Sequence, residues 1–157
     1  MIENSNLREI KIKLEHYCSY QERCHKEVVG KLLDLGANSQ DIDMVVVHLI
    51  EHNFLNEARF ASLFALSKFH QKKWGKVRLK NELKIRNIGD FLISKALNEI
   101  PTEEYEETFE ALSIKTWESI LEKNTLKKRK KFCDTLLRKG WESDWVYKKS
   151  IALEQLG

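Results

Sequence analysis

Apolar residues recur at spacings of three and four positions along most of the chain. The run Ile42, Val45, Val46 and Leu49 is one example, and this spacing places apolar side chains on one face of an α-helix. Short polar or glycine-containing stretches interrupt the pattern at 35–39, 52–57, 72–76, 86–90, 99–103, 122–125 and 138–143. We therefore predict an all-α fold of about nine amphipathic helices, with the single proline, Pro101, at one of the breaks.

The pattern also repeats. A shift of 51 positions places Val28, Leu32, Gly36, Ile42 and Leu49 on Leu79, Leu83, Asn87, Ile93 and Ile100, and a shift of 104 places them on Phe132, Leu136, Gly140, Val146 and Leu153. Four of these positions stay apolar, and the fifth is always Gly or Asn, which can end a helix in a left-handed conformation. A further helix precedes each pair, at about 1–20, 57–71 and 103–122. We predict three tandem three-helix repeats, at residues 1–53, 54–101 and 102–157, in an elongated, curved array.

The net charge of +3 conceals blocks of opposite sign. Residues 68–95 hold nine Lys/Arg against two Asp/Glu, and residues 123–157 hold ten against four. The segment between them, 96–122, holds one basic residue against eight acidic ones, and residues 1–67 hold seven against ten. Two basic blocks therefore flank an acidic one.

The first basic block contains the candidate binding residues Lys68, Lys72, Lys73, Lys76, Arg78, Lys80 and Lys84. Lys72, Lys76 and Lys80 recur every four positions, so on one helix they would share a face. Such a ridge would bind phosphates, or carboxylates of a partner. A solvated helix face is about equally consistent with this stretch alone.

The second basic block, KKRKK at 127–131, adds Lys127, Lys128 and Lys131 to the candidate binding residues, with Arg138 and Lys139 further along the same predicted helix. It would form a parallel ridge on the equivalent helix of the third repeat. Five consecutive basic residues cannot share one helical face, so this block is a weak nucleic-acid signal by itself.

Several residues near the breaks have predicted structural roles. Trp74 is interpreted as a packing anchor rather than a base-stacking platform, and Gly75 as the residue that allows a tight turn. Asn56 is the predicted N-cap of the next helix, with Phe54 or Leu55 packed against Phe60. We expect Arg59 to reach acidic residues of the preceding repeat. Ser39, Thr102, Thr125 and Ser143 are further predicted N-caps.

Nothing in the sequence indicates catalysis, a cofactor or a metal. His48 and His52 lie four positions apart, but no third ligand follows at a recognisable spacing, and no Cys-x-x-Cys pair is present. Phosphate-binding glycine loops and nucleophile motifs are absent as well. Three cysteines without a disulfide framework, and an N-terminal stretch without an apolar signal segment, predict a cytoplasmic protein with no membrane span. We expect no enzymatic activity and no cofactor.

Three stretches together resemble the RecX family of bacterial recombination regulators: RCHKEVVGKLLDLG at 23–36, FLNEARFA at 54–61 and KKWGKVRLKNELKIRNI at 72–88. The family pattern has a helix start here represented by Arg23 and Glu27, a glycine stop at Gly36, an Arg-Phe-Ala motif and a Trp-Gly helix start. Two positions depart from it. Cys24 replaces the usual serine, which weakens the capping box with Glu27, and Asn56 replaces an acidic residue.

The resemblance implies the tandem three-helix fold and a partner. Proteins of this family bind the RecA filament on DNA within its helical groove, and restrain ATP hydrolysis, strand exchange and co-protease activity. On that basis we expect a monomer that docks on the filament through its lysines, with at most weak direct contact to DNA. Two alternatives remain open: a helical protein that binds nucleic acid directly, and a helical scaffold for another acidic protein.

Overall fold

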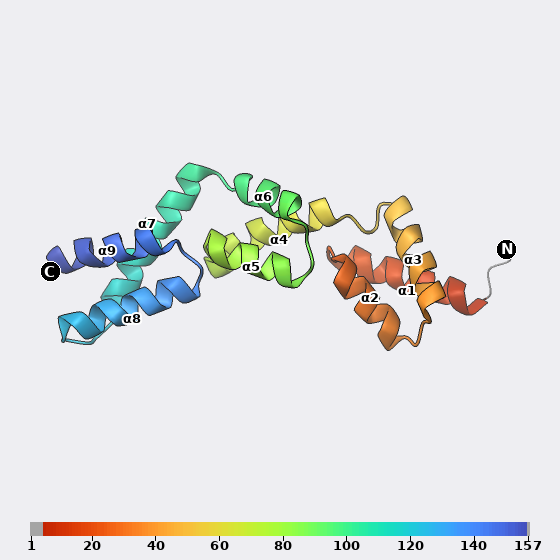
Figure 1. Cartoon of the computed structure of the whole chain (residues 1–157), viewed down its shortest axis with the longest axis horizontal. Coiled ribbons are helices and arrows are strands. Elements are labelled where there is room, and N and C mark those ends of the chain that lie inside the picture. The colour runs from red at the N-terminus through yellow and green to blue at the C-terminus, as the bar shows by residue number, and fades with distance from the viewer. Residues whose placement is uncertain (1–4, 157) are drawn as a thin grey trace.

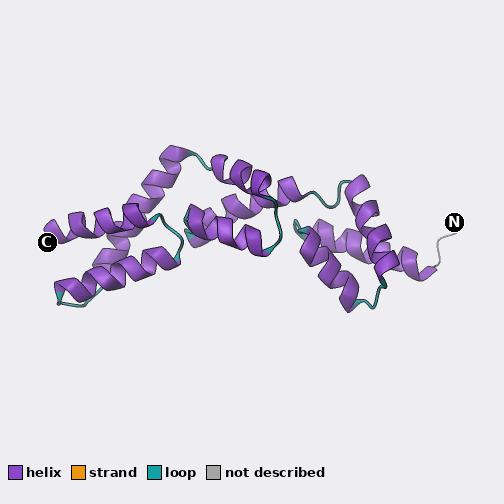
Figure 2. Cartoon of the chain, viewed as in Figure 1, coloured by secondary structure: helices purple, strands orange, loops and turns teal. Residues whose placement is uncertain are grey.

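The computed structural model describes residues 5–156 as a row of helices with short connections (Figures 1 and 2). The nine helices of this part of the chain are α1 (Ser5–Tyr20), α2 (His25–Asp34), α3 (Ser39–Glu51), α4 (Glu57–Lys72), α5 (Lys76–Ile85), α6 (Asp90–Asn98), α7 (Thr102–Ser119), α8 (Thr125–Arg138) and α9 (Ser143–Gln155). No strand occurs within 5–156, which confirms the all-α prediction. The predicted first helix and the outer limits of the first and third repeats include residues 1–4 and 157, which lie outside the described residues.

The second helix of each group of three ends as predicted. Gly36 and Gly140 have positive φ angles of 78° and 93°, and Asn87 has a φ of 61°. Each of these residues closes its helix in the left-handed region, where Gly costs nothing and Asn costs little. The recurring cap, recognised from the sequence shift, is therefore confirmed at all three positions.

Helix starts agree less well with the predictions. Asn56 caps α4 as predicted, since its side chain accepts a hydrogen bond from the Arg59 amide at 2.9 Å. Asn38 and Asn124, each one residue before the predicted cap, perform the same function for α3 and α8. The predictions of Ser39 and Thr125 are wrong because an asparagine one residue earlier already reaches the third amide of the helix. The predictions of Thr102 and Ser143 are also wrong by one residue, since Pro101 and Glu142 precede α7 and α9.

The α2 start keeps its capping box despite the cysteine. The Cys24 amide donates to Glu27 Oε1 at 3.2 Å, and the sulfur faces the Glu27 amide. Cys24 is fully buried, and burial raises the pKa of its thiol to about 11. Arg23 lies over the Tyr17 ring, with its guanidinium carbon 3.8 Å from the ring centroid, and donates to the Tyr17 carbonyl at 3.0 Å. The first turn of α2 is therefore anchored to the end of α1.

The closest helix packing falls within three consecutive groups. Helices α1, α2 and α3 pack together, as do α4, α5 and α6, and then α7, α8 and α9. Figure 1 shows the three groups side by side along the long axis, with the ends of the chain at opposite ends of the row. We call these groups the first, second and third repeats. Boundaries between them at 53/54 and 101/102 stay a prediction.

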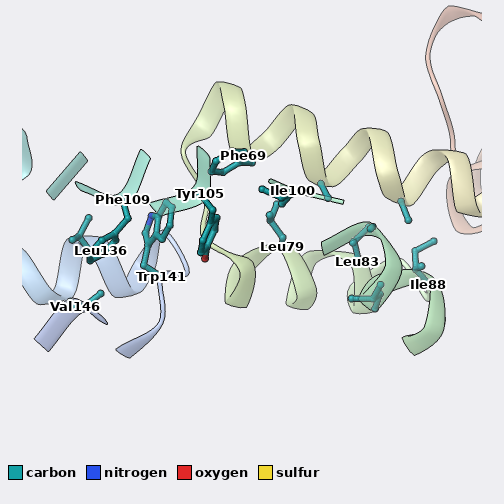
Figure 3. Close-up of a cluster of buried hydrophobic side chains, with 14 of the residues drawn as sticks. Phe69, Leu79, Leu83, Ile88, Ile100, Tyr105, Phe109, Leu136, Trp141 and Val146 are labelled. Atoms are coloured by element: carbon teal, nitrogen blue, oxygen red, sulfur yellow. The ribbon is translucent and has the colours of Figure 1, made fainter. Parts of the chain in front are cut away.

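Buried side chains form two cores rather than three. The smaller core lies within the first repeat and includes Leu14, Leu32 and Leu49. The larger one runs without interruption through the second and third repeats. Figure 3 shows Leu79 and Ile100 of the second repeat on one side of Tyr105 and Trp141, with Phe109 and Leu136 of the third repeat on the other. The second and third repeats therefore share a core, which the repeat pattern did not predict.

The predicted packing of Phe54 or Leu55 against Phe60 is not what buries Phe60. Phe60 belongs to the larger core, whereas Phe54 and Leu55 belong to the smaller one.

The first and second repeats meet mainly through polar contacts. Arg59 Nε donates to both carboxylate oxygens of Glu22, at 2.7 and 2.5 Å, and a terminal nitrogen of its guanidinium donates to the Asn53 carbonyl at 3.0 Å. Lys26 Nζ donates to the Ile85 carbonyl at 2.9 Å, at the C-terminal end of α5. The expectation that Arg59 reaches an acidic residue of the preceding repeat is confirmed.

The second and third repeats meet where two glycines bring the backbones together. The Gly75 amide donates to the Lys139 carbonyl at 2.9 Å, and the Val77 amide donates to the Gly140 carbonyl at 3.0 Å. A Cβ atom added at Gly75 would lie 2.4 Å from the Gly140 carbonyl oxygen, and one added at Gly140 would lie 2.2 Å from Arg78 Cβ. Gly75 has an ordinary φ of −82°, so it is required for this close approach and not for a left-handed turn.

We predict that Gly75→Ala destabilises the protein by roughly 1–3 kcal/mol, because the added methyl group must push the two repeats apart. Gly30→Ala is the matched control, since nothing lies within 4 Å of a Cβ added at that position in α2. The control should stabilise the protein by about 0.5–1 kcal/mol through helix propensity alone. Denaturant unfolding measures both, and an equal gain in stability for Gly75→Ala would contradict the close approach.

Candidate interaction site at the joint between repeats

The first basic block does not form one helical ridge. Lys72 is the last residue of α4, and Lys73 follows it in the left-handed region with a φ of 57°. Helix α5 starts only at Lys76, after Trp74 and Gly75. The predicted single face of Lys72, Lys76 and Lys80 is therefore wrong, because the helix ends at Lys73 so that Gly75 can approach the third repeat.

The turn instead places basic residues of both blocks beside one another. Lys139 Nζ donates to the Lys72 carbonyl at 3.2 Å, and Arg78 donates to the Arg138 carbonyl at 3.2 Å. Each cation therefore lies at the C-terminal end of a helix of the other repeat, where carbonyl groups lack helical partners and the helix dipole favours positive charge. We call the whole set the joint basic cluster: Lys72, Lys73, Lys76, Arg78, Arg138 and Lys139.

Trp74 lies at the edge of this cluster and is half-buried. The guanidinium carbon of Arg78 is 4.1 Å from the Trp74 ring centroid, and Lys68 Nζ is 5.8 Å from it. Its ring also packs against Phe64, with the centroids 6.4 Å apart. These contacts agree with the interpretation of Trp74 as a packing anchor that holds two cations in place.

Tyr105 connects the cluster to the shared core. Its hydroxyl accepts a hydrogen bond from the Lys76 amide at 2.8 Å and donates one to the Glu142 carboxylate. Lys76 Nζ lies 4.8 Å from the Tyr105 ring centroid, and the Trp141 ring centroid lies 4.6 Å from it. Burial and the neighbouring carboxylate raise the pKa of Tyr105 above its ordinary value, so the hydroxyl keeps its proton. The indole nitrogen of Trp141 donates to the Lys73 carbonyl at 3.0 Å and closes the turn from the other side.

Lys80 and Lys84 extend the basic surface along α5. Both are exposed, they lie four positions apart on one face, and their side chains have no charged or aromatic partner in the part of the chain that the structure describes. Lys72 and Lys73 are likewise exposed. These four lysines are free to meet an external partner, whereas Arg78 and Lys139 are committed to the joint.

The remaining predicted residues lie away from the joint. Lys127, Lys128 and Lys131 lie in the first half of α8, about 10–16 Å along the helix from Arg138 at 1.5 Å per residue. Lys128 Nζ lies 4.4 Å from the Trp117 ring centroid, and Lys131 pairs with Glu122 at 3.4 Å. The two blocks therefore meet only through Arg138 and Lys139, which the predicted site set left out. No sequence signal pairs them with Lys72 and Arg78, because the contact depends on how two repeats dock.

Other chemistry is not supported in the described part of the chain. No group of three or more His, Cys, Asp and Glu residues that could hold a metal occurs within it. His48 instead contacts Glu15 at 3.0 Å and stacks on His52, with the ring centroids 4.3 Å apart. Burial also raises the pKa of the Cys18 thiol to about 11, so it stays protonated near neutral pH. Within the described residues, every helix is too short or too polar to cross a bilayer.

The fold and the joint define a class of protein: a helical repeat protein of three-helix units, two of which are locked together beside a basic surface. A family model described as "RecX, second three-helix domain" matches residues 56–97, a range that contains the whole first set of candidate lysines. The regulatory proteins RecX of Bacillus thuringiensis (strain Al Hakam) and Bacillus cereus (strain AH187) are each 26% identical over 153 residues, which is 98% of this chain and 56% of theirs. The chain thus spans just over half the length of these curated relatives.

Two solved structures share the fold. A crystal structure of regulatory protein RecX matches with a TM-score of 0.80 and 20% identity, over 91% of this chain and 70% of the other. The crystal structure of RecX from Lactobacillus salivarius matches with a TM-score of 0.79 and 23% identity, over 97% of this chain and 98% of the other. Together with the family model and the curated relatives, these matches show that the chain is similar to regulatory proteins RecX along nearly its whole length and shares their fold.

We predict that Tyr105→Phe destabilises the protein by roughly 1–3 kcal/mol, because it leaves the Lys76 amide without its hydroxyl partner at a closed joint. Tyr147→Phe is the control, since Tyr147 is 51% exposed on α9. Its loss of a hydroxyl should change the free energy of unfolding by less than about 0.5 kcal/mol. Equal effects of the two substitutions in thermal unfolding would show that the Tyr105 hydroxyl does not tie the repeats together.

Proposed function

We propose that this protein binds the RecA filament on DNA and inhibits the ATPase, recombinase and co-protease activities of RecA. The observation that carries this proposal is the similarity to regulatory proteins RecX, which extends over 153 residues at 26% identity. The protein would act as a regulator without enzymatic activity and without a cofactor, working in the cytoplasm as a monomer.

The arrangement of the repeats supports a filament partner. Three helical repeats in a row offer a surface that can follow several neighbouring subunits (Figure 1). Lys72, Lys73, Lys80 and Lys84 provide positive charge that is not neutralised within the described residues, and the joint fixes the turn that positions Lys72 and Lys73. Such a surface favours rapid association with carboxylates or phosphates and fixes the orientation of binding more than it adds affinity.

A second candidate function is direct binding to nucleic acid. The observation that favours it is the joint basic cluster, where six basic residues of two repeats lie at one joint and Arg78 lies over the Trp74 ring. Phosphate contacts by such a cluster would make binding fall steeply with salt. This function would not require RecA, and that separates it from the leading proposal.

The proposed function is tested by RecA ATP hydrolysis on single-stranded DNA with increasing amounts of this protein. Its binding to the same DNA without RecA is measured in parallel. Inhibition well below one protein per RecA subunit, with little binding to bare DNA, is the expected result. Tight, salt-sensitive DNA binding without inhibition would replace the leading proposal with the second candidate.

We predict that the triple variant Lys72→Glu, Lys73→Glu and Lys80→Glu weakens inhibition about tenfold or more, because three charges that face solvent become repulsive to an acidic partner. The matched control reverses Lys95, Lys115 and Lys123, which are also exposed but lie on α6, on α7 and before α8. Both variants change the net charge equally, and circular dichroism checks that helicity is kept. Equal inhibition by the two variants would remove this surface from the mechanism.

A further inference from the structure

Two apolar grooves lie between the first and third helices of their repeats. In the second repeat, Leu63 and Leu66 of α4 face Ala96 of α6 and the adjoining Ile100 across a hollow of about 360 Å³. Leu63 is 49% exposed and Leu66 is 37% exposed, so the groove is open to solvent. Apolar side chains that line an open groove in this way are typical of a binding surface.

The third repeat has a groove in the equivalent place. Ile114 and Trp117 of α7 face Leu153 of α9 and the adjoining Leu156 across a hollow of about 350 Å³. A shift of 51 positions places Leu63 on Ile114 and Leu66 on Trp117, and a shift of 53 places Ile100 on Leu153. The two grooves therefore share position, size and apolar character, so they suit the same kind of ligand.

The rims of both grooves are acidic. The one basic residue of each groove is already neutralised, since Arg59 pairs with Glu22 and Lys149 pairs with Glu110. That leaves Glu99, directly after α6, at the first groove and Glu118 of α7 at the second, so the two carboxylates lie on different walls of their grooves. Neither carboxylate has a side-chain partner among residues 5–156, and both are exposed. Both residues belong to the acidic segment 96–122, which the proposed binding surface of lysines does not include.

We infer that the two grooves bind a short protein segment that presents bulky apolar side chains flanked by Lys or Arg. The apolar side chains would fill the hollow, and the flanking cations would meet Glu99 or Glu118. Because two equivalent grooves follow one another along the array, the partner is one that presents the same segment twice. The inference rests on the proposed function, in which successive subunits of the RecA filament supply that segment.

The test compares binding of variants to RecA filaments assembled on single-stranded DNA with a non-hydrolysable ATP analogue. Leu63→Glu combined with Ile114→Glu places a carboxylate in each hollow and should weaken binding about tenfold or more. The control combines Phe91→Glu and Ile151→Glu, which lie on α6 and α9, are 79% and 45% exposed and line neither groove. The control should bind within about twofold of wild type, because it adds the same charge to the same two repeats but outside the grooves.

A second pair of variants tests the rims. Glu99→Lys with Glu118→Lys should weaken binding about fivefold or more, since each new lysine would repel the flanking cation of the segment. Glu103→Lys with Glu107→Lys changes the charge of the same acidic segment equally, outside the grooves, and should have less than half that effect. Circular dichroism of all four variants checks that the helices are intact.

The outcomes separate the two proposals. If wild type does not bind filaments at all, the proposed function fails and the filament is excluded as the occupant of the grooves. If wild type binds and the groove variants bind equally well, the groove inference fails alone. Sedimentation of wild type as an oligomer that the groove variants convert to monomers would also overturn the inference, because the occupant would then be a second copy of this chain.

Discussion

The close backbone contact between Gly75 and Gly140 determines how the second and third repeats meet. Neither position can hold a side chain, since an added Cβ atom would lie within 2.4 Å of the opposite repeat. Only at this distance can Gly75 and Val77 donate to the Lys139 and Gly140 carbonyls. The same approach allows Tyr105 and Trp141 to fill the shared core. His70 and Glu104, 2.6 Å apart, add a contact between α4 and α7. Two units that share a core and a backbone contact are expected to move as one.

The joint between the first and second repeats has a different physical character. Arg59, Glu22 and Lys26 make hydrogen bonds there, but the cores on either side remain separate apart from Cys24, which belongs to the larger one. Polar contacts at a partly exposed joint contribute little net free energy, because the charges lose hydration when they pair. The first repeat is therefore held in place less firmly than the third. The second and third repeats therefore form a rigid pair, whereas the first repeat can adjust its position to a partner.

Local features were predictable from the sequence, whereas features that depend on docking were not. The helices and the left-handed caps at Gly36, Asn87 and Gly140 follow from periodicity and backbone preference, both of which act over a few residues. The predicted ridge of Lys72, Lys76 and Lys80 does not form, because the spacing of four positions crosses a turn between two helices. Contacts with the third repeat impose that turn, and the spacing alone does not indicate it. Arg138 and Lys139 were recognised as basic but not as neighbours of Lys72, since 67 positions separate Lys139 from it. Contacts of that kind depend on how repeats pack, and periodicity within one repeat holds no information about it.

The joint between the second and third repeats is expected to stay closed in solution, and amide hydrogen exchange measures whether it does. The Gly75 and Val77 amides lie before the first helical hydrogen bond of α5, so only the third repeat protects them. We predict that both amides exchange as slowly as the Leu79 amide, which bonds to the Gly75 carbonyl within its own repeat. Fast exchange of the Gly75 and Val77 amides beside a protected Leu79 amide would show instead that the joint opens while the helices persist.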